Sequence, residues 1–529
     1  MTSLRARLGS LGAVALLAAV ALAGCSSGGG DSTGGATAES LPDDQQKLVY
    51  VPSYGWAGSD ISQSPLEIGI SMAISQTLES LITLDKDSKP QPKLADSWQW
   101  TDPMTLVFKL HPGVKFSDGQ AFTAADVKGS IERYIGWGAA LKTVLAPITS
   151  VTATDDLTVT IRTSAPTGTL LGVLSLVRIG QGKFSHSDTK IAADNTYWSK
   201  PIGTGPFVIS DYVANDHFTF TRNDTYWGTK AKLKTLTMKQ ITDVNGKITA
   251  LANGEAQVVG DVPYDQIAQV KGMSNVNFTQ QDSLNYYFLW FDNKNQYLKD
   301  QRVRQAMWQA LDLPTIQQQL FGDTASVMTA YCPVAAFGCV APSAGFPKYD
   351  QAAAKKLLAD AGYASGFTVD VIYSTANGAG FANMMQAFVS AWKAVGITVT
   401  PKAMDPATWL KTFSTVNPDG THGWNMDMQP NQTITGDADY TIYRLYNCAA
   451  ARLGYCNKDL DQITTQAQRI TDQAARLKLY QQAADIMAKD TPAVPLFEVK
   501  VNAATTKAVQ GLVIPPNEFI DFSTVYLTK

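Results

Sequence analysis

The sequence predicts a mixed α/β protein with two or three domains. Its length predicts the domain count, because a body of about 500 residues is too long for one hydrophobic core. Its patterning predicts the fold class. Residues 350–399 alternate helix and strand signals, as a three-layer α/β domain does. Residues 201–227 alternate apolar and polar positions between turn residues, which indicates antiparallel sheet.

The N-terminus has the composition of a secretory signal. Arg5 and Arg7 precede an apolar run over residues 11–22, which is only about half as long as a membrane-spanning helix requires. The run ends in Leu-Ala-Gly before Cys25 and resembles the lipobox at which bacterial lipoproteins are cleaved and lipidated. A buried helix with a chance cysteine is the alternative. We therefore expect a signal peptide over residues 1–24 and a lipid on Cys25.

Composition sets several expectations for the rest of the chain. Residues 25–44 are rich in Gly, Ser and Thr, which predicts a flexible tether. No later stretch is long and apolar enough to span a bilayer, so a globular body is expected. The 43 Lys and Arg residues nearly balance 46 Asp and Glu residues without a basic run. Nucleic acid is therefore not an expected partner.

The body contains four further cysteines, an even number that predicts disulfides in an oxidising compartment. Their separations favour the local bridges Cys332 to Cys339 and Cys448 to Cys456, although four cysteines permit three pairings. A zinc site is the alternative. It is disfavoured because neither pair has the short spacing of zinc ligands and only His422 lies in that part of the chain. We expect two disulfides and no metal site.

The N-terminal half has clear strand and helix signals. Residues 47–51 predict a buried strand, and the Pro-Ser-Tyr-Gly turn after it is of the kind that often faces a ligand. Residues 92–134 predict a strand, a turn and a helix that begins at Thr123. The Thr123 hydroxyl can cap this helix, and Asp126 favours its positive end. Residues 284–291 are continuously apolar and aromatic, as in a fully buried strand.

The C-terminal half has a similar series of signals and no internal repeat. Asp300 should cap a helix that buries one apolar face, formed by Val303, Ala306, Met307, Ala310 and Leu311. A second helix should begin at Asp350 and end at Gly362. The other expected elements are a strand over 367–373, a helix over 384–394, a strand over 397–399, helices over 460–470 and 474–488, and a strand over 494–499.

Several motifs occur in the order found in one known family. They include Pro-Lys-Leu-Ala-Asp-Ser-Trp at 92–98, Val-Lys-Phe-Ser-Asp-Gly at 114–119, Gly-Thr-Gly-Pro-Phe at 203–207, Asp-Gln-Arg-Val-Arg at 300–304 and Leu-Leu-Ala-Asp-Ala-Gly-Tyr at 357–363. Together they resemble the family 5 extracellular solute-binding proteins, the peptide and nickel receptors of ABC importers. The resemblance extends over most of residues 47–529. Most of these residues should have structural roles, and Arg302 and Arg304 should lie on the solvent face of a helix.

The resemblance implies a periplasmic-binding-protein-like fold of class II (cluster C), with three lobes and a hinge between two mixed α/β lobes. It places lobe I at residues 45–75, 199–282 and 500–529, an inserted lobe II at 76–198 and lobe III at 283–499. It also implies a monomer without a cofactor, at the extracytoplasmic face of the cell membrane. The expected partners are an ABC permease with its ATPase, and the membrane through the lipid on Cys25.

In peptide-binding relatives, a stretch of lobe III supplies the carboxylate that pairs with the α-amine of the ligand. An ion pair suits this position because an unpaired, desolvated ammonium is costly. Asp437 is the favoured partner here, since residues 440–446 resemble the aromatic helix that follows in relatives. If instead Trp424 is the family tryptophan, Asp427 takes this role. Both carboxylates can also be solvated loop groups.

Three aromatic residues complete the candidate ligand site. They are Tyr54 and Trp56, which follow the first strand, and Trp424. Such side chains can pack against a ligand, although core packing would explain them equally well.

The sequence thus predicts a receptor that captures a di- or oligopeptide for an importer. An oligosaccharide or a metal chelate is the alternative ligand. A lipid-anchored hydrolase is the rival class, because Ser187 and Lys190 match the S-x-x-K motif, but no Lys-Thr-Gly follows and neither G-x-S-x-G nor H-E-x-x-H occurs. We therefore expect no catalysis. A receptor that serves a sensor kinase, or a peptide chaperone, would have the same fold.

Overall fold

The computed structural model describes residues 39–53, 55–56, 68–137, 141–182, 200–450 and 452–529. The predicted signal peptide, Cys25, most of the tether and Tyr54 lie outside these residues. All elements discussed below belong to the unit Ser40–Lys529.

An eleven-stranded mixed sheet includes most of the strands, in the order β15-β14-β16-β12-β17-β11-β1-β10-β9-β8, with β13 paired to β17. Its strands are β1 (Lys47–Val51), β8 (Phe207–Val213), β9 (His217–Arg222), β10 (Thr235–Lys239), β11 (Val258–Gly260), β12 (Val276–Phe291), β13 (Ala325–Val327), β14 (Phe367–Ser374), β15 (Ile397–Met404), β16 (Met426–Gln432) and β17 (Ala493–Thr506).

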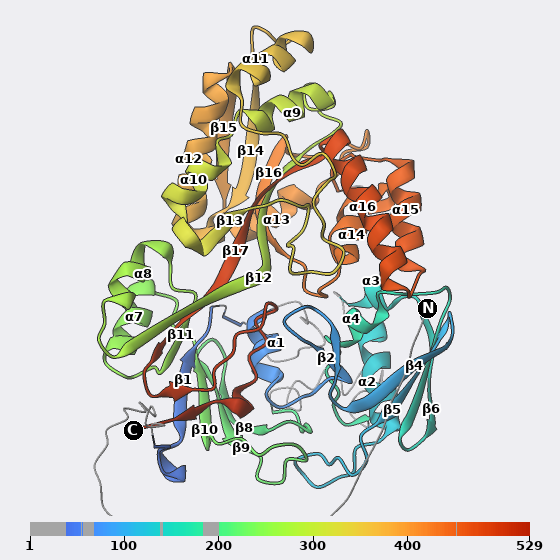
Figure 1. The fold of residues 1–529 in the computed structure, drawn as a ribbon, viewed down its shortest axis with the longest axis vertical. Coiled ribbons are helices and arrows are strands. Elements are labelled where there is room, and N and C mark those ends of the chain that lie inside the picture. Colours follow the sequence, from blue (N-terminus) through green and yellow to red (C-terminus); the bar gives the residue numbers. More distant parts are fainter. Residues whose placement is uncertain (1–38, 54, 57–67, 138–140, 183–199, 451) are drawn as a thin grey trace, which may run out of the picture. The chain divides into compact units, whose positions relative to one another are not determined.

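Two long strands, β12 and β17, join the two halves of this sheet. They run antiparallel side by side (Figure 1), from the pair Val276 and Thr506 to the pair Trp290 and Ala493. β17 pairs on its other side with β11, and β12 pairs on its other side with β16. Their register shifts between Gln281 and Asn285, so regular pairing is interrupted there.

A second sheet has four antiparallel strands in the order β4-β5-β7-β6. These strands are β4 (Ala95–Asp102), β5 (Thr105–Leu110), β6 (Ile148–Asp155) and β7 (Thr158–Thr163). Two short pairs complete the strands: β2 (Ile82–Leu84) with β3 (Pro90–Pro92), and β18 (Val509–Gln510) with β19 (Tyr526–Leu527).

The helices cover the sheets and connect their strands. In chain order they are α1 (Ile68–Ile74), α2 (Ala124–Trp137), α3 (Lys142–Leu145), α4 (Leu170–Leu174), α7 (Val244–Ala252), α8 (Tyr264–Lys271), α9 (Gln301–Gln309), α10 (Leu313–Leu320), α11 (Gln351–Asp360), α12 (Gly378–Ala394), α13 (Pro406–Ser414), α14 (Ile442–Tyr446), α15 (Lys458–Gln468) and α16 (Gln473–Asp490). Short 3₁₀ turns include η1 (Asp43–Gln45), η5 (Ala438–Tyr440) and η6 (Cys448–Ala450). Among the described residues, no helix combines the length and apolar character needed to cross a membrane.

Separate apolar cores lie within this arrangement. One surrounds β14 and β15 with helices α9 to α12, a second fills the space between the four-stranded sheet and α2, and a third lies against β1, β8, β9 and β10. The predicted apolar face of α9 is confirmed, since all five of its residues are at most 2% exposed.

Local signals predicted most of these elements correctly. The Asp300 side chain caps α9 by accepting from the Arg302 N–H at 2.9 Å, and Asp350 caps α11 in the same manner. The start of α2 is also confirmed, but the expected cap by the Thr123 hydroxyl is replaced by a bond in which Thr123 is the donor. The Asp126 carboxylate accepts from both the backbone N–H and the hydroxyl of Thr123.

The expected position of Arg304 on a solvent face is wrong. Its guanidinium is buried and donates to the carbonyls of Thr491 at 2.8 Å and Leu298 at 2.7 Å. It thereby satisfies backbone acceptors where α16 ends, because carbonyls in the last turn of a helix lack helical partners. Arg302 does lie at the surface and pairs with Asp300.

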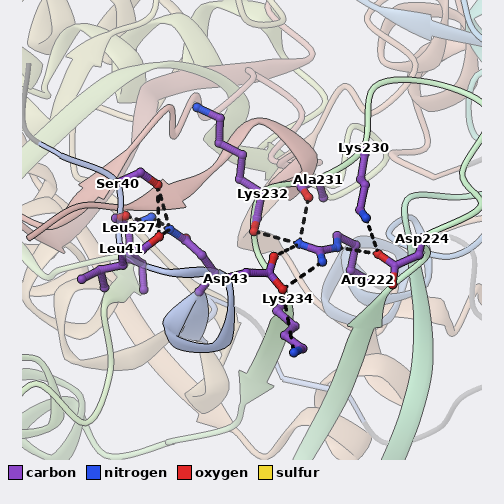
Figure 2. Close-up of polar contacts among 11 residues, drawn as sticks. Ser40, Leu41, Asp43, Arg222, Asp224, Lys230, Ala231, Lys232, Lys234 and Leu527 are labelled. Carbon is purple, nitrogen blue, oxygen red and sulfur yellow. Dashed lines mark hydrogen bonds and ion pairs between the residues drawn. The ribbon is translucent and has the colours of Figure 1, made fainter.

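The first described residues contact the C-terminal end of the chain (Figure 2). The Leu41 N–H donates to the Leu527 carbonyl at 2.8 Å, and the Gln46 amide bonds both the N–H and the carbonyl of Leu527. Asp43 forms an ion pair with Arg222 at 2.6 Å. Residues 40–44, which the sequence analysis assigns to the tether, therefore contact the body.

Candidate ligand-binding site

A cavity of about 460 Å³ lies where five strands meet, and we call it the β12–β17 cavity. Its lining comes from the middle of β12 and β17, the end of β16 and the loops after β1 and β11. These positions include Asn285 and Tyr287, Val499 to Asn502, Pro430 to Gln432, Ser53 and Asp261. Glu518, from the segment after β18, and Ala376, Asn377 and Phe381, around the start of α12, also line it.

Sheet topology brings two of these loops together. β1 and β11 are parallel neighbours, with Val51 opposite Val259. Because both strands end at the same edge of the sheet, Ser53 and Asp261 follow them into the same space. Gly260 permits this close approach, since a Cβ atom there would lie 2.9 Å from the Ser53 hydroxyl. A cavity at the carboxyl ends of parallel strands is a common position for a ligand.

Two carboxyl groups face this cavity from strained backbone. Asp261 has a φ of 56° and Glu518 a φ of 66°. Residues with a Cβ rarely adopt this left-handed region, and strain of this kind is concentrated at functional sites. Packing and hydrogen bonds with neighbouring residues must therefore offset the backbone strain at both acidic residues.

The electrostatics of the two acids disfavour their charged forms. Burial raises the pKa of Glu518 to about 7, while a 2.6 Å hydrogen bond from the Asn285 amide lowers it and the Asp261 charge adds to the rise. Asp261 has surface open to the cavity, yet the surrounding protein raises its pKa, and the Lys247 charge opposes this. Within the described part of the chain, no cation contacts either carboxylate within ion-pair distance.

The cavity also offers a positive group. Lys500, on β17, lines it, and no acceptor for its ammonium is found among the described residues. The lining thus includes two carboxyl groups and an ammonium. This arrangement can bind a small solute that carries charges of both signs.

The residues that the sequence singled out lie elsewhere. Asp437 is buried and forms an ion pair with Arg476 at 2.8 Å. Asp427 is fully buried, and it accepts hydrogen bonds from the indole N–H of Trp409 at 2.9 Å and from Gln429. Neither carboxylate lines the β12–β17 cavity, and neither is a solvated loop group. The role of Asp437 or Asp427 as the amine partner stays a prediction.

The two described aromatic candidates are core residues. Trp56 is 3% exposed and its ring lies 5.1 Å from that of Phe218. Trp424 is 1% exposed and donates to the Phe413 carbonyl at 3.2 Å. Core packing, the alternative interpretation of both side chains, is what the structure shows.

Sequence reasoning missed Asp261 and Glu518. Asp261 follows a short apolar run, Val258 to Gly260, in the same way that the Ser53 loop follows β1. That parallel could have indicated a second loop at the same sheet edge. No local signal marks Glu518, which lies in a turn after two prolines.

The cysteine prediction is confirmed. Cys332 bonds to Cys339 and Cys448 bonds to Cys456. No group of three His, Cys, Asp or Glu side chains within the described ranges is arranged to hold a metal ion.

Comparison with known proteins gives a consistent result. The family model "Bacterial extracellular solute-binding proteins, family 5 Middle" matches residues 89–452. The glutathione-binding protein GsiB of Escherichia coli strain K12 is 26% identical over 483 residues, which cover 86% of this chain and 89% of that protein. GsiB of Pectobacterium atrosepticum is 27% identical over 490 residues, covering 86% and 90%.

Solved structures share the fold. DppA of Helicobacter pylori, in complex with the peptide STSA, has a TM-score of 0.77 at 22% identity and covers 92% of this chain and 99% of its own. CtaP of Listeria monocytogenes has a TM-score of 0.80 at 20% identity, with coverage of 91% and 99%. The mixed α/β chain therefore has the class II periplasmic-binding-protein fold. Family members are extracytoplasmic receptors that deliver solutes to an ABC permease and its ATPase, not enzymes. This chain belongs to family 5 of the bacterial extracellular solute-binding proteins.

Proposed function

We propose that this protein is a lipid-anchored receptor that binds a small peptide in the β12–β17 cavity and delivers it to an ABC importer. The observation that supports this most directly is the pair Asp261 and Glu518, two carboxyl groups in left-handed backbone with no cation in ion-pair contact among the described residues. A ligand ammonium would supply the missing positive charge.

The positive charge of Lys500, opposite in sign to the two carboxylates, favours a peptide over a simple amine as the ligand. A peptide carries an α-ammonium and an α-carboxylate, so one ligand can satisfy both the acid pair and the lysine. Relatives with this fold include proteins named for glutathione or solved with short peptides. Other neighbours were solved with agropinic acid or a nickel–histidine complex. The experiment below therefore also includes non-peptide solutes.

The strand arrangement suggests how capture would occur. We propose that lobe I (residues 45–75, 199–282 and 500–529) and lobe III (283–499) move about β12 and β17, which pair with each other at the cavity. A ligand that contacts both lobes binds the closed state better, so its binding shifts the population toward closure. Small-angle scattering should then show contraction when ligand is added.

Calorimetry with di- to pentapeptides, glutathione, an oligosaccharide and a nickel–histidine complex tests the proposal. We expect heat with at least one peptide. Glu518→Gln and Asp261→Asn should each weaken its binding by ~2–5 kcal/mol, because each removes a carboxylate that would pair with the ligand ammonium once the closed cavity excludes water. Asp265→Asn, an exposed acid on α8, is the matched control. Binding of only the sugar or the chelate, or unchanged peptide affinity in both cavity variants, would contradict the proposal.

A further inference from the structure

A second cavity, of about 660 Å³, lies away from the β12–β17 cavity and shares no lining residue with it. We call it the arginine cavity. One wall consists of positions between Val144 and Val173, around α3 and α4. The other consists of positions between Thr435 and Arg469, from η5, α14, α15 and the loop that η6 begins. The cavity is partly open to solvent, and polar and charged side chains line it, as they do where a small solute or water binds.

Arg444, on α14, is one of two central cations in this cavity. Its Nε donates to the Tyr440 carbonyl at 2.8 Å, and its guanidinium lies 4.0 Å above the Tyr440 ring. These contacts fix the plane of the guanidinium. Its two Nη groups find no acceptor among the described residues, so they are available to a ligand.

Arg452 is the other central cation. It lies in the loop that the Cys448–Cys456 disulfide closes, and it is half-buried. No described carboxylate lies within ion-pair distance of it, and no described acceptor receives a hydrogen bond from it. Burial and the neighbouring Arg444 charge both lower the pKa of Arg452. Two guanidinium groups thus repel each other in a partly desolvated space, which costs free energy unless an anion neutralises them.

One acid lines the arginine cavity, and it does not offset this charge fully. Burial raises the pKa of Asp439 to about 7, and the charge of Asp437 adds to the rise, while Arg476, Gln468 and Arg444 lower it. The Oδ1 atom of Asp439 receives no hydrogen bond from the described residues. Arg469 adds a third guanidinium at the exposed edge. Below neutral pH the lining is therefore strongly positive.

We infer that the arginine cavity is a second binding site, which takes an anionic group, a carboxylate or a phosphate, of a small solute between Arg444 and Arg452. A planar guanidinium donates two parallel N–H groups, which match two oxygens of either anion. The Thr169 hydroxyl and the second N–H of the Asn447 amide, whose first N–H bonds the Tyr443 carbonyl, also line the cavity and can donate to further oxygens. Because these groups come from both walls, a bound anion would connect residues 144–173 with residues 435–469.

The test titrates inorganic phosphate and succinate separately into the mature protein by calorimetry. The buffer has constant ionic strength in chloride and a pH below the Asp439 pKa of about 7. We expect saturable binding of at least one anion. Arg452→Gln and Arg444→Gln should each weaken it at least ~10-fold, because each removes a charge-assisted pair of hydrogen bonds. Arg452→Lys keeps the charge but loses the two parallel N–H donors, so its anion affinity should lie between that of the wild type and that of Arg452→Gln.

Three controls separate this site from other effects. Arg469→Gln, at the exposed edge, should change affinity by less than ~3-fold, since exposed charges interact weakly. Glu518→Gln should leave anion binding unchanged while it weakens peptide binding, so the two proposals can fail independently. Thermal unfolding of each variant confirms that it is folded. The inference is overturned if neither anion binds the wild type, or if the folded Arg444 and Arg452 variants bind as tightly as Arg469→Gln does.

Discussion

The guanidinium of Arg476 holds the carboxylate of Asp437 at two points: Nη1 lies 2.8 Å from Oδ2, and Nη2 donates to Oδ1 at 2.8 Å. The Tyr480 hydroxyl adds a third hydrogen bond at 3.1 Å. Asp437 also caps η5 through the Asp439 N–H. The carboxylate is therefore part of a buried structural network that joins α16 to the segment before α14.

Replacing Asp437 should damage stability rather than recognition. Asp437→Asn leaves Arg476 buried without its anion, which should cost ~3–5 kcal/mol of unfolding free energy. Urea unfolding measures this, with Asp265→Asn as the control. Peptide affinity per folded molecule should stay near the wild-type value. A stable variant that has lost peptide binding would instead assign Asp437 to the ligand amine.

The stability of the protein should fall as pH rises through the range set by Asp427. Burial raises its pKa from 3.8 to about 7, so the folded state retains a proton that the unfolded state has lost. The stabilisation is complete below about pH 4 and is lost as pH approaches 7, amounting to ~2–4 kcal/mol. Asp427→Asn should reduce this slope, because an amide keeps the neutral form at every pH. Unfolding curves across this pH range measure the slope, and a slope identical to wild type would contradict the assignment.

Ligand binding should strengthen with pH where Glu518 ionises. Its pKa of about 7 means that the free protein carries the neutral acid at low pH, whereas an ammonium ligand prefers the carboxylate. Affinity should rise by up to about tenfold per pH unit below 7 and level off above it, until the ligand amine deprotonates near roughly pH 8. Calorimetry at several pH values checks this. Glu518→Gln should remove the rise, and a variant with an unchanged pH profile would exclude Glu518 as its source.

The two disulfides should differ in function. Each closes a short loop, so replacing either cysteine pair by serine should cost ~2–3 kcal/mol of stability. Removal of the Cys448–Cys456 bridge should also weaken phosphate or succinate binding, because that loop positions Arg452. The Cys332 and Cys339 double variant serves as the control and should bind the anion normally. Equal anion affinity in both double variants would show that the bridge does not position Arg452.

Attachment to the membrane should depend on one residue. Cys25→Ser removes the thiol that accepts the lipid in the proposed lipobox, so acyl-group labelling should disappear and the protein should leave the membrane fraction. Labelling at the wild-type level would refute the lipid anchor.

Elements with local causes could be predicted from sequence. The cap at Asp300, the apolar spacing of α9 and the short cysteine separations each act within about ten residues, and the structure confirms all three. Arg304 could not be placed correctly, because its acceptors include carbonyls at Asp490 and Thr491, far along the chain.

The candidate site was harder to predict because topology assembles it. Asp261 reaches the cavity through the parallel pairing of β1 with β11, and Glu518 reaches it from a turn near the C-terminus. Asp437 and Asp427 lie in the expected segment, but sequence did not reveal Arg476 or Trp409 as their partners. Residue type suggested the chemistry, and only the fold could show which carboxylates are free for a ligand.

The position of β17 has a consequence for the order of folding. β17 lies near the end of the sequence, yet it pairs between β11 and β12 in the middle of the large sheet. Gln46 likewise bonds Leu527, which is 481 residues away in the sequence. During synthesis, β1 and β11 can pair before β17 emerges, but the sheet remains in two pieces with open edges. Such long-range pairing slows folding and leaves the incomplete chain prone to association. A chain that stops before residue 493 should therefore keep open strand edges at β11 and β12, and it should be more sensitive to protease there than the complete chain is.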